Sequence, residues 1–229
     1  MKRWIALMAA LLMLLSLAAC GTPNASEVRG EVGTNETTPT EAPTEAETTA
    51  ELELGKAENN VYTNQFLGLG CKLDEDWQFT PEEELLQQSQ IVADNLTDEQ
   101  LKEQIQNASV IYDMIATNIS TGASVNVNLQ NIGLVYGALL DMETYFQQIA
   151  EQLPSAMAQL GLENTQIQKT EVTFLGETVE AIQSHSEIQG ADFYQLQIPI
   201  IKSGYIANIT ISSFTEDGVT QILNTFYAL

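Results

Sequence analysis

Histidine, cysteine and basic side chains are scarce in this sequence of 229 residues. One histidine and two cysteines are too few for a zinc site built on several His and Cys ligands, or for a disulfide framework. Eight lysines and arginines face 31 aspartates and glutamates, which gives a formal net charge of −23. Nucleic acid and anionic membrane surfaces both require clustered basic side chains. We therefore expect no nucleic-acid partner for the folded part of the chain.

The first twenty residues have the pattern of a secretory signal. Two basic residues open the chain, and residues 4–19 are apolar with one exception. A bilayer span needs roughly 20 apolar residues, so this shorter run predicts a cleaved signal and not a permanent span. The run ends in Leu17-Ala18-Ala19-Cys20.

This ending closely resembles the lipobox of bacterial lipoproteins. The resemblance implies a diacylglycerol thioether on Cys20 and cleavage between Ala19 and Cys20. Two acyl chains suffice for stable anchoring. We therefore expect a lipid-anchored protein on the extracytoplasmic face of the cell membrane. The alternative is an ordinary signal peptide that happens to contain Cys20.

A composition change after Cys20 predicts a tether. Residues 21–58 contain eight Thr, nine Glu and three Pro, with no aromatic residue. Such a segment buries too little apolar area to offset the entropy of ordering, so we expect it to be disordered. A flexible coil of 38 residues has an r.m.s. span of roughly 35 Å. The tether would hold the rest of the chain away from the membrane.

The remaining residues, 59–229, have the length of one globular domain and contain no arginine. Alternating apolar side chains predict strands at 69–73, 110–117, 124–129, 167–174, 178–188, 192–201 and 205–212. Helices are predicted to start at Thr80, Thr97 and Thr215 and to span 141–160. Together these elements predict an α+β fold on a mainly antiparallel sheet.

Some predictions concern single positions. Thr80 is expected to cap the first helix, with Pro81 in its first turn. Pro154 is expected to kink or interrupt the long helix. Pro199 is expected at an edge or a bulge, because proline cannot donate to a strand ladder. Phe226 is placed on the apolar stripe of the last helix.

The start of this region resembles a known family. The stretch Tyr62-Thr63-Asn64-Gln65-Phe66-Leu67-Gly68-Leu69-Gly70, followed by Leu73 and Trp77, is similar to the opening of PsbP-like domains. The predicted element order also resembles the Mog1/PsbP-like α/β/α sandwich. The resemblance implies that fold over residues 60–229 and an accessory or binding role. It implies no transferable active site.

Single reactive side chains are the first candidates for chemistry. His185 is the only histidine, and its neighbours Ser184 and Ser186 point to the opposite strand face. We expect it to be a solvated or hydrogen-bonded surface residue. Cys71 shares a predicted strand face with two leucines, so we expect a small buried hydrophobe and not a reactive thiol.

An acidic cluster, Asp74-Glu75-Asp76 with Glu82-Glu83-Glu84, flanks Trp77. It could bind calcium or a cationic partner, or only solvate a turn and favour a helix N-terminus. Asp74 and Asp76 match the start of an EF-hand loop, but position six is Phe79 in place of Gly and position twelve is Leu85 in place of Glu. We therefore predict no metal site.

No nucleophile elbow or Ser-x-x-Lys pair is present, so the sequence designates no catalytic residue and no cofactor. Polar side chains on the strand faces predict either a solvated sheet surface or a polar binding face. We expect a surface lipoprotein whose acidic domain is a non-catalytic binding or accessory module for an unidentified protein or small molecule. The alternatives are an extracellular hydrolase that uses carboxylates and a solute-capturing lipoprotein.

Overall fold

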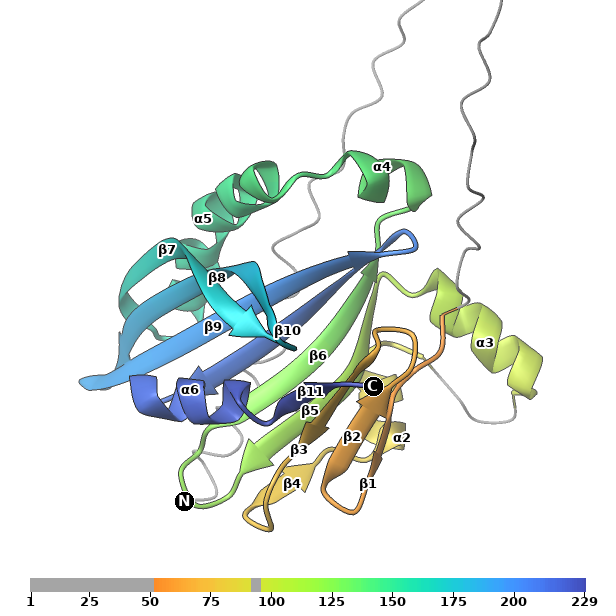
Figure 1. Cartoon of the computed structure of the whole chain (residues 1–229), viewed down its shortest axis with the longest axis horizontal. Helices are drawn as coiled ribbons and strands as arrows, with labels where there is room; N and C mark the ends of the chain where they lie inside the picture. Colours follow the sequence, from red (N-terminus) through yellow and green to blue (C-terminus); the bar gives the residue numbers. More distant parts are fainter. Residues whose placement is uncertain (1–51, 92–95) are drawn as a thin grey trace, which may run out of the picture.

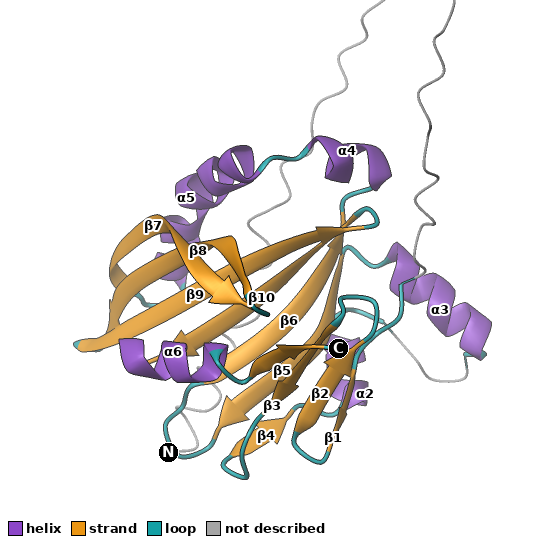
Figure 2. Ribbon diagram, viewed as in Figure 1, coloured by secondary structure: helices purple, strands orange, loops and turns teal. Residues whose placement is uncertain are grey.

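The predicted alternation of apolar side chains produces two antiparallel sheets, shown as strands in Figure 2. The structure is a computed structural model that describes residues 52–91 and 96–229. The signal segment, Cys20 and the tether up to residue 51 lie outside the described residues. The predicted α+β class and antiparallel strand pairing are confirmed.

The larger sheet has seven strands in the order β4-β5-β6-β10-β9-β8-β7. In that order the strands are β4 (Trp77–Phe79), β5 (Val110–Asn118), β6 (Ser124–Asn131), β10 (Tyr205–Ser213), β9 (Ala191–Lys202), β8 (Glu177–Ile188) and β7 (Glu163–Phe174). Every strand pair in it is antiparallel.

Three tight turns join β7 to β10 in succession. Their central residues are Leu175-Gly176, Gln189-Gly190 and Ser203-Gly204, and all six have positive φ. Positive φ at both central positions is the geometry of type I′ turns, whose twist matches that of paired strands. The gaps between the predicted strands, at residues 175–177, 189–191 and 202–204, fall at the same places.

The smaller sheet has four strands in the order β1-β2-β3-β11. They are β1 (Lys56–Glu58), β2 (Val61–Asn64), β3 (Leu69–Lys72) and β11 (Phe226–Ala228). Phe226 therefore begins a strand and does not continue the last helix. The helix ends before Phe226 because the chain pairs with β3 there. Lys72 N–H donates to Thr225 O at 3.1 Å, directly before the paired residues of β11.

The predicted start of the folded region at residue 59 is too late. Leu52 is buried, and β1 pairs with β2 from Lys56 onward. Gly55 N–H also donates to Asp113 Oδ1 on β5 at 2.7 Å. These contacts fix residues 52–58, which composition alone had assigned to the tether.

The described residues contain five helices: α2 (Glu82–Gln88), α3 (Asp98–Asn107), α4 (Leu134–Leu139), α5 (Met142–Gln159) and α6 (Glu216–Leu223). Thr97 caps α3 in a reciprocal capping box with Gln100, as predicted, and Thr215 caps α6. Thr80 does not cap α2. Its N–H extends the ladder by donating to Ile115 O at 2.8 Å, so Pro81 becomes the N-cap residue.

The two expected effects of proline have different outcomes. Helix α5 runs through Pro154 without interruption, so of the two predicted effects, a kink or an interruption, the interruption does not occur. Strand β9 lies inside the sheet order, but its pairing with β8 ends at Gln197. Pro199 pairs only with Asn208 of β10, so it lies where β9 has a locally open edge. The helix tolerates Pro154 because one face of α5 is packed against the sheet.

The larger sheet is the middle layer. The smaller sheet and α6 cover one face, as Figure 1 shows in front of the strands, and their apolar side chains join Val125, Val127 and Ile209 in the main core. Helix α5 packs on the other face, where Leu153 and Met157 meet a second apolar cluster, and α2 contributes a third. No helix in the described ranges is long and apolar enough to span a bilayer.

Candidate functional site

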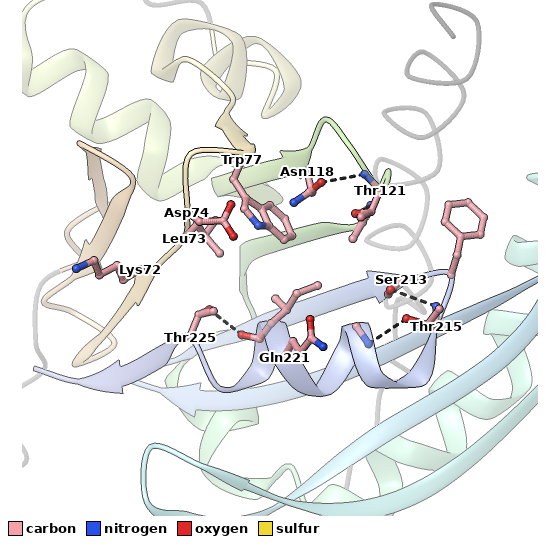
Figure 3. Close-up of a pocket in the computed structure, with 14 residues that line it drawn as sticks. Lys72, Leu73, Asp74, Trp77, Asn118, Thr121, Ser213, Thr215, Gln221 and Thr225 are labelled. Atoms are coloured by element: carbon pink, nitrogen blue, oxygen red, sulfur yellow. Dashed lines mark hydrogen bonds between the residues drawn. The ribbon is translucent and has the colours of Figure 1, made fainter.

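A cavity of about 570 Å³ opens where the β3–β4 loop, the β5–β6 turn and α6 converge (Figure 3). Its apolar walls include Leu73, Trp77 and Ile222. Polar side chains from three separate elements face the same space, among them Asn118 and Gln221. The cavity lies beside the first residue of β6, Ser124.

The β3–β4 loop positions the tryptophan. Asp74 Oδ1 accepts from Asp76 N–H at 3.0 Å, and Asp74 O accepts from Asn60 Nδ2 at 3.1 Å. Trp77 N–H then donates to Asp74 O at 3.3 Å, and Trp77 is the first residue of β4. The loop is thus held by its own hydrogen bonds, and the half-buried indole is placed in the cavity wall.

Asn118 organises the opposite wall. Its Oδ1 accepts from Ser120 N–H at 3.0 Å and from Thr121 N–H at 2.9 Å, which folds the β5–β6 turn. Its Nδ2 donates no hydrogen bond within residues 52–91 and 96–229, and Figure 3 shows this nitrogen on the side of Trp77. The residue is 8% exposed and lines the cavity, so Nδ2 can donate to a molecule that enters it.

The hydroxyl groups at the start of α6 serve the helix. Thr215 Oγ1 accepts from Gly218 N–H at 3.1 Å, and Ser213 Oγ accepts from Thr215 N–H at 3.2 Å. Neither hydroxyl faces a histidine or lysine base, so residues 52–91 and 96–229 place no activated nucleophile at this cavity. Among the lining side chains that the structure describes, Asp74 is the only carboxylate and Lys72 the only cation.

Together these groups suit a small, uncharged ligand with an apolar face. An indole provides a flat surface, and the amides of Asn118 and Gln221 provide donors and acceptors at its rim. A sugar ring has this combination of a hydroxyl edge and an apolar face. The sequence had drawn attention to Asp74 and Trp77, but no sequence signal connected them with Asn118 or Gln221.

The acidic cluster around Trp77 does not gather into a metal site. Asp74 Oδ1 is engaged in the loop, and Glu82, Glu83 and Glu84 lie in the first turn of α2, where negative charge favours the helix dipole. Within the described ranges, no three His, Cys, Asp or Glu side chains are placed to share a metal ion. The cluster therefore has a structural explanation in the loop and the helix.

His185 lies away from the cavity. Its Nε2 is 2.8 Å from Asp192 Oδ1, and its ring stacks on Tyr194 with 4.6 Å between centroids. The side chain is 38% exposed, which confirms the predicted hydrogen-bonded surface residue. Ser184 and Ser186 are buried on the other strand face, as the alternation requires.

Cys71 is fully buried in the main core, as predicted. Its Sγ lies 3.1 Å from Thr225 Oγ1. Burial raises the pKa of the thiol to about 11, with the Thr225 hydrogen bond opposing the shift. At neutral pH the side chain is an uncharged thiol, so it has the packing role of a small hydrophobe.

Sequence reasoning missed Asp113. This carboxylate is 6% exposed, at the register shift in β5. It accepts from the Tyr62 hydroxyl, from Asn64 Nδ2 at 2.7 Å and from Gly55 N–H at 2.7 Å. Burial raises the pKa of Asp113 and also raises the pKa of Tyr62 well above 10. The available signal was a single acidic residue inside the apolar run of β5.

The polar strand face is not a solvated surface. The amide and hydroxyl side chains on it are less than 10% exposed: Ser124, Asn126, Asn128, Gln195, Gln197, Thr210 and Ser212. They bond to one another, for example from Gln195 Nε2 to Ser212 Oγ at 3.0 Å. Gln195 Oε1 accepts no hydrogen bond within the described ranges. Of the two predicted alternatives, a solvated surface or a polar binding face, the solvated surface is excluded for these seven side chains.

Comparisons with known proteins identify no family. No family model matches the chain, and no curated protein does so either. Among solved structures, it is similar to LpqN of Mycobacterium tuberculosis, involved in cell envelope biogenesis, at 10% identity and a TM-score of 0.36, over 69% of this chain and 82% of that one. It is also similar to PA94 of Pseudomonas aeruginosa, a protein of unknown function and putative regulator. That match has 14% identity and a TM-score of 0.29, and it covers 57% of this chain and 78% of that one. At these scores neither likeness carries an inference about activity, and the resemblance to PsbP-like domains stays a prediction.

Proposed function

We propose that this protein is a lipoprotein anchored through Cys20 on the outer side of a cell membrane, with a non-catalytic domain that binds a small, uncharged polar ligand. The anchor rests on the lipobox-like end of the signal segment. The binding role rests on one observation above all, the cavity in which Trp77 faces the amides of Asn118 and Gln221. An accessory role toward other envelope components follows from this combination.

The cavity gives little support to a carboxylate hydrolase. Glycoside hydrolysis uses two carboxyl groups about 5–10 Å apart, and Asp74 is the only one that the described residues place in the cavity wall. Asp113, the most deeply buried acidic side chain in the described ranges, has both oxygens engaged by internal donors. A solute-capturing lipoprotein that closes two lobes on its ligand is also less favoured, because the described ranges share one central sheet.

Replacement of Cys20 by alanine is expected to release the protein from membranes. The thiol is the proposed attachment point of both acyl chains in the signal-processed protein, and without them no anchor remains. Fractionation of cells expressing the parent and the Cys20→Ala variant measures this, with mass spectrometry of the N-terminal peptide as the direct readout of lipidation. A variant that sediments with membranes as fully as the parent contradicts the anchor.

The ligand cavity can be tested through its own tryptophan. The sequence has two tryptophans, and cleavage before Cys20 would remove Trp4, leaving Trp77 as the reporter. We expect soluble N-acetylglucosamine oligomers to shift the emission of Trp77. The Gln221→Ala variant should bind them about 2–10-fold more weakly, which is the effect of one lost hydrogen bond.

Gln221 suits this test because its side chain is exposed and its removal leaves the cap of α6 intact. A matched control is Gln168→Ala, a second glutamine on an exposed strand position outside the cavity. This control should bind like the parent. Unchanged Trp77 emission up to millimolar oligosaccharide, with the protein folded, contradicts a sugar-binding role for the cavity.

A further inference from the structure

Helix α4 presents an unusual apolar surface. Its side chains Val135, Leu139, Leu134 and Tyr136 are 77%, 76%, 56% and 45% exposed. Single exposed apolar side chains are normal on any protein, but four on one six-residue helix form a contiguous patch. Exposing them costs free energy in water, so a patch of this kind indicates a surface that is covered in use.

Helix α4 itself carries no charged side chain, and the nearest acidic residue in sequence is Asp141, the cap of α5. Residues 131–140 include no charged side chain, in a sequence with a net charge of −23. The β9–β10 turn packs beside the helix, since a Cβ on Gly137 would lie 3.4 Å from Gly204 Cα. Lys202, the last residue of β9 before that turn, is a cation whose Nζ lies 5.9 Å from the centre of the Phe66 ring. The patch is therefore the apolar end of an otherwise acidic molecule.

The N-terminal chain enters the fold at the same end. Glu53 and Leu54 line a cavity together with Ile105 of α3. The end of α3 is joined to the end of β6, because Asn131 Nδ2 donates to Gln106 O at 3.3 Å. Helix α4 begins three residues later, and Figure 1 shows α3 and α4 toward one end of the large sheet.

We propose that α4 inserts its apolar side chains into the headgroup region of the membrane that holds the lipid anchor. This inference rests on the proposed anchor at Cys20. The 31 residues between Cys20 and Leu52 belong to the tether predicted from composition, and a flexible coil of that length would have an r.m.s. span of about 30 Å. Such a tether would keep the patch at a millimolar effective concentration beside the bilayer. A weak apolar contact is then sufficient.

The chemistry of the patch selects the kind of lipid surface. Apolar side chains and one interfacial tyrosine favour insertion at the boundary of headgroups and acyl chains. Lys202 alone gives little attraction to anionic lipids, and the acidic remainder opposes it. Insertion is therefore driven by apolar burial and proceeds on zwitterionic lipid.

Insertion of α4 also gives the domain an orientation. Strand β6 runs from the Trp77 cavity at Ser124 to α4 at Asn131, a length of about 25 Å for its eight residues. With α4 in the headgroup region, the cavity faces away from the membrane. A ligand in the extracellular space can then enter it freely.

The test places a fluorescent label at one of two exposed apolar positions in the full chain. Val135→Cys puts the label on α4, and Ile119→Cys is the matched control, 63% exposed in the β5–β6 turn beside the cavity. Cys71 is buried and should not react. The lipidated variants are reconstituted in phosphatidylcholine vesicles with and without nitroxide-bearing lipids.

We expect nitroxide lipids to lower the emission of the label at 135 at least twofold and to leave the label at 119 unchanged. The double variant V135D/L139D, labelled at Tyr136→Cys, should lose this quenching while still floating with the vesicles. If aqueous iodide quenches the labels at 135 and 119 equally while the protein floats with the vesicles, the insertion of α4 is overturned but the anchor is not. Protection from iodide without quenching by lipid also overturns it and indicates a protein contact. Protein that does not float with vesicles contradicts the anchor itself, and the insertion with it.

Discussion

Replacement of Asp113 by alanine is expected to lower the free energy of unfolding by about 3–5 kcal/mol. The carboxylate is 6% exposed and accepts three hydrogen bonds, from Tyr62, Asn64 and Gly55. Alanine leaves all three donors buried without an acceptor, together with a cavity. Urea unfolding followed by circular dichroism measures the difference.

The pH dependence separates the role of the charge from that of packing. Burial raises the pKa of Asp113, against the opposing effect of its hydrogen bonds. The folded protein therefore binds the proton more tightly than the unfolded chain does. The resulting stabilisation is present at low pH and is lost as the pH rises through the folded pKa.

The Asp113→Asn variant has no titrating group at this position. Its deficit in stability relative to the parent should therefore become smaller as the pH rises from about 4, the ordinary range of an aspartate. A deficit that grows over that interval would mean that the ionised carboxylate is the favoured form in the fold. A loss below about 1 kcal/mol for Asp113→Ala would contradict the hydrogen-bonded cluster altogether.

The second large effect is expected at Gly55, where alanine should cost about 2–4 kcal/mol. A Cβ at this position would lie 2.7 Å from Tyr62 Cζ and closer still to Cε2. The ring cannot move aside easily, because Tyr62 is fully buried and its hydroxyl donates to Asp113. The clash therefore either displaces the ring or detaches β1.

Lys56→Ala is the matched control for Gly55→Ala. Lys56 is exposed in the same segment, so its replacement should change the stability by no more than about 0.5 kcal/mol. The same urea titration serves both variants. If Gly55→Ala unfolds at the parent's midpoint, residues 52–58 do not pack against β5, and the folded region begins later.

The run from β7 to β10 was predictable because its information is local. Each turn has glycine at its second central position, and each strand alternates in sequence. The capping box at Thr97 is equally local. Strands β1, β4 and β11 have three residues each, too few to display a period, and their positions depend on distant partners.

The candidate site was predictable only in part. Asp74 and Trp77 are neighbours in sequence and attracted notice as a cluster. Asn118 and Gln221 are ordinary polar residues in a turn and on a helix, and only the packing of α6 beside the β5–β6 turn places them around the indole. Asp113 was missed for a related reason. Its donors Tyr62 and Asn64 lie about 50 positions away in sequence, and Gly55 belongs to the segment that composition assigns to a tether.

The contact between Cys71 and Thr225 joins positions 154 residues apart, and β11 pairs with β3 beside it. Closing so long a loop is entropically expensive, and such contacts form late in folding. The hairpins from β7 to β10 need no long loop and can form as soon as they are available. A chain exported from its N-terminus would therefore emerge with its small sheet incomplete, and the main core would close only after Phe226 had crossed the membrane.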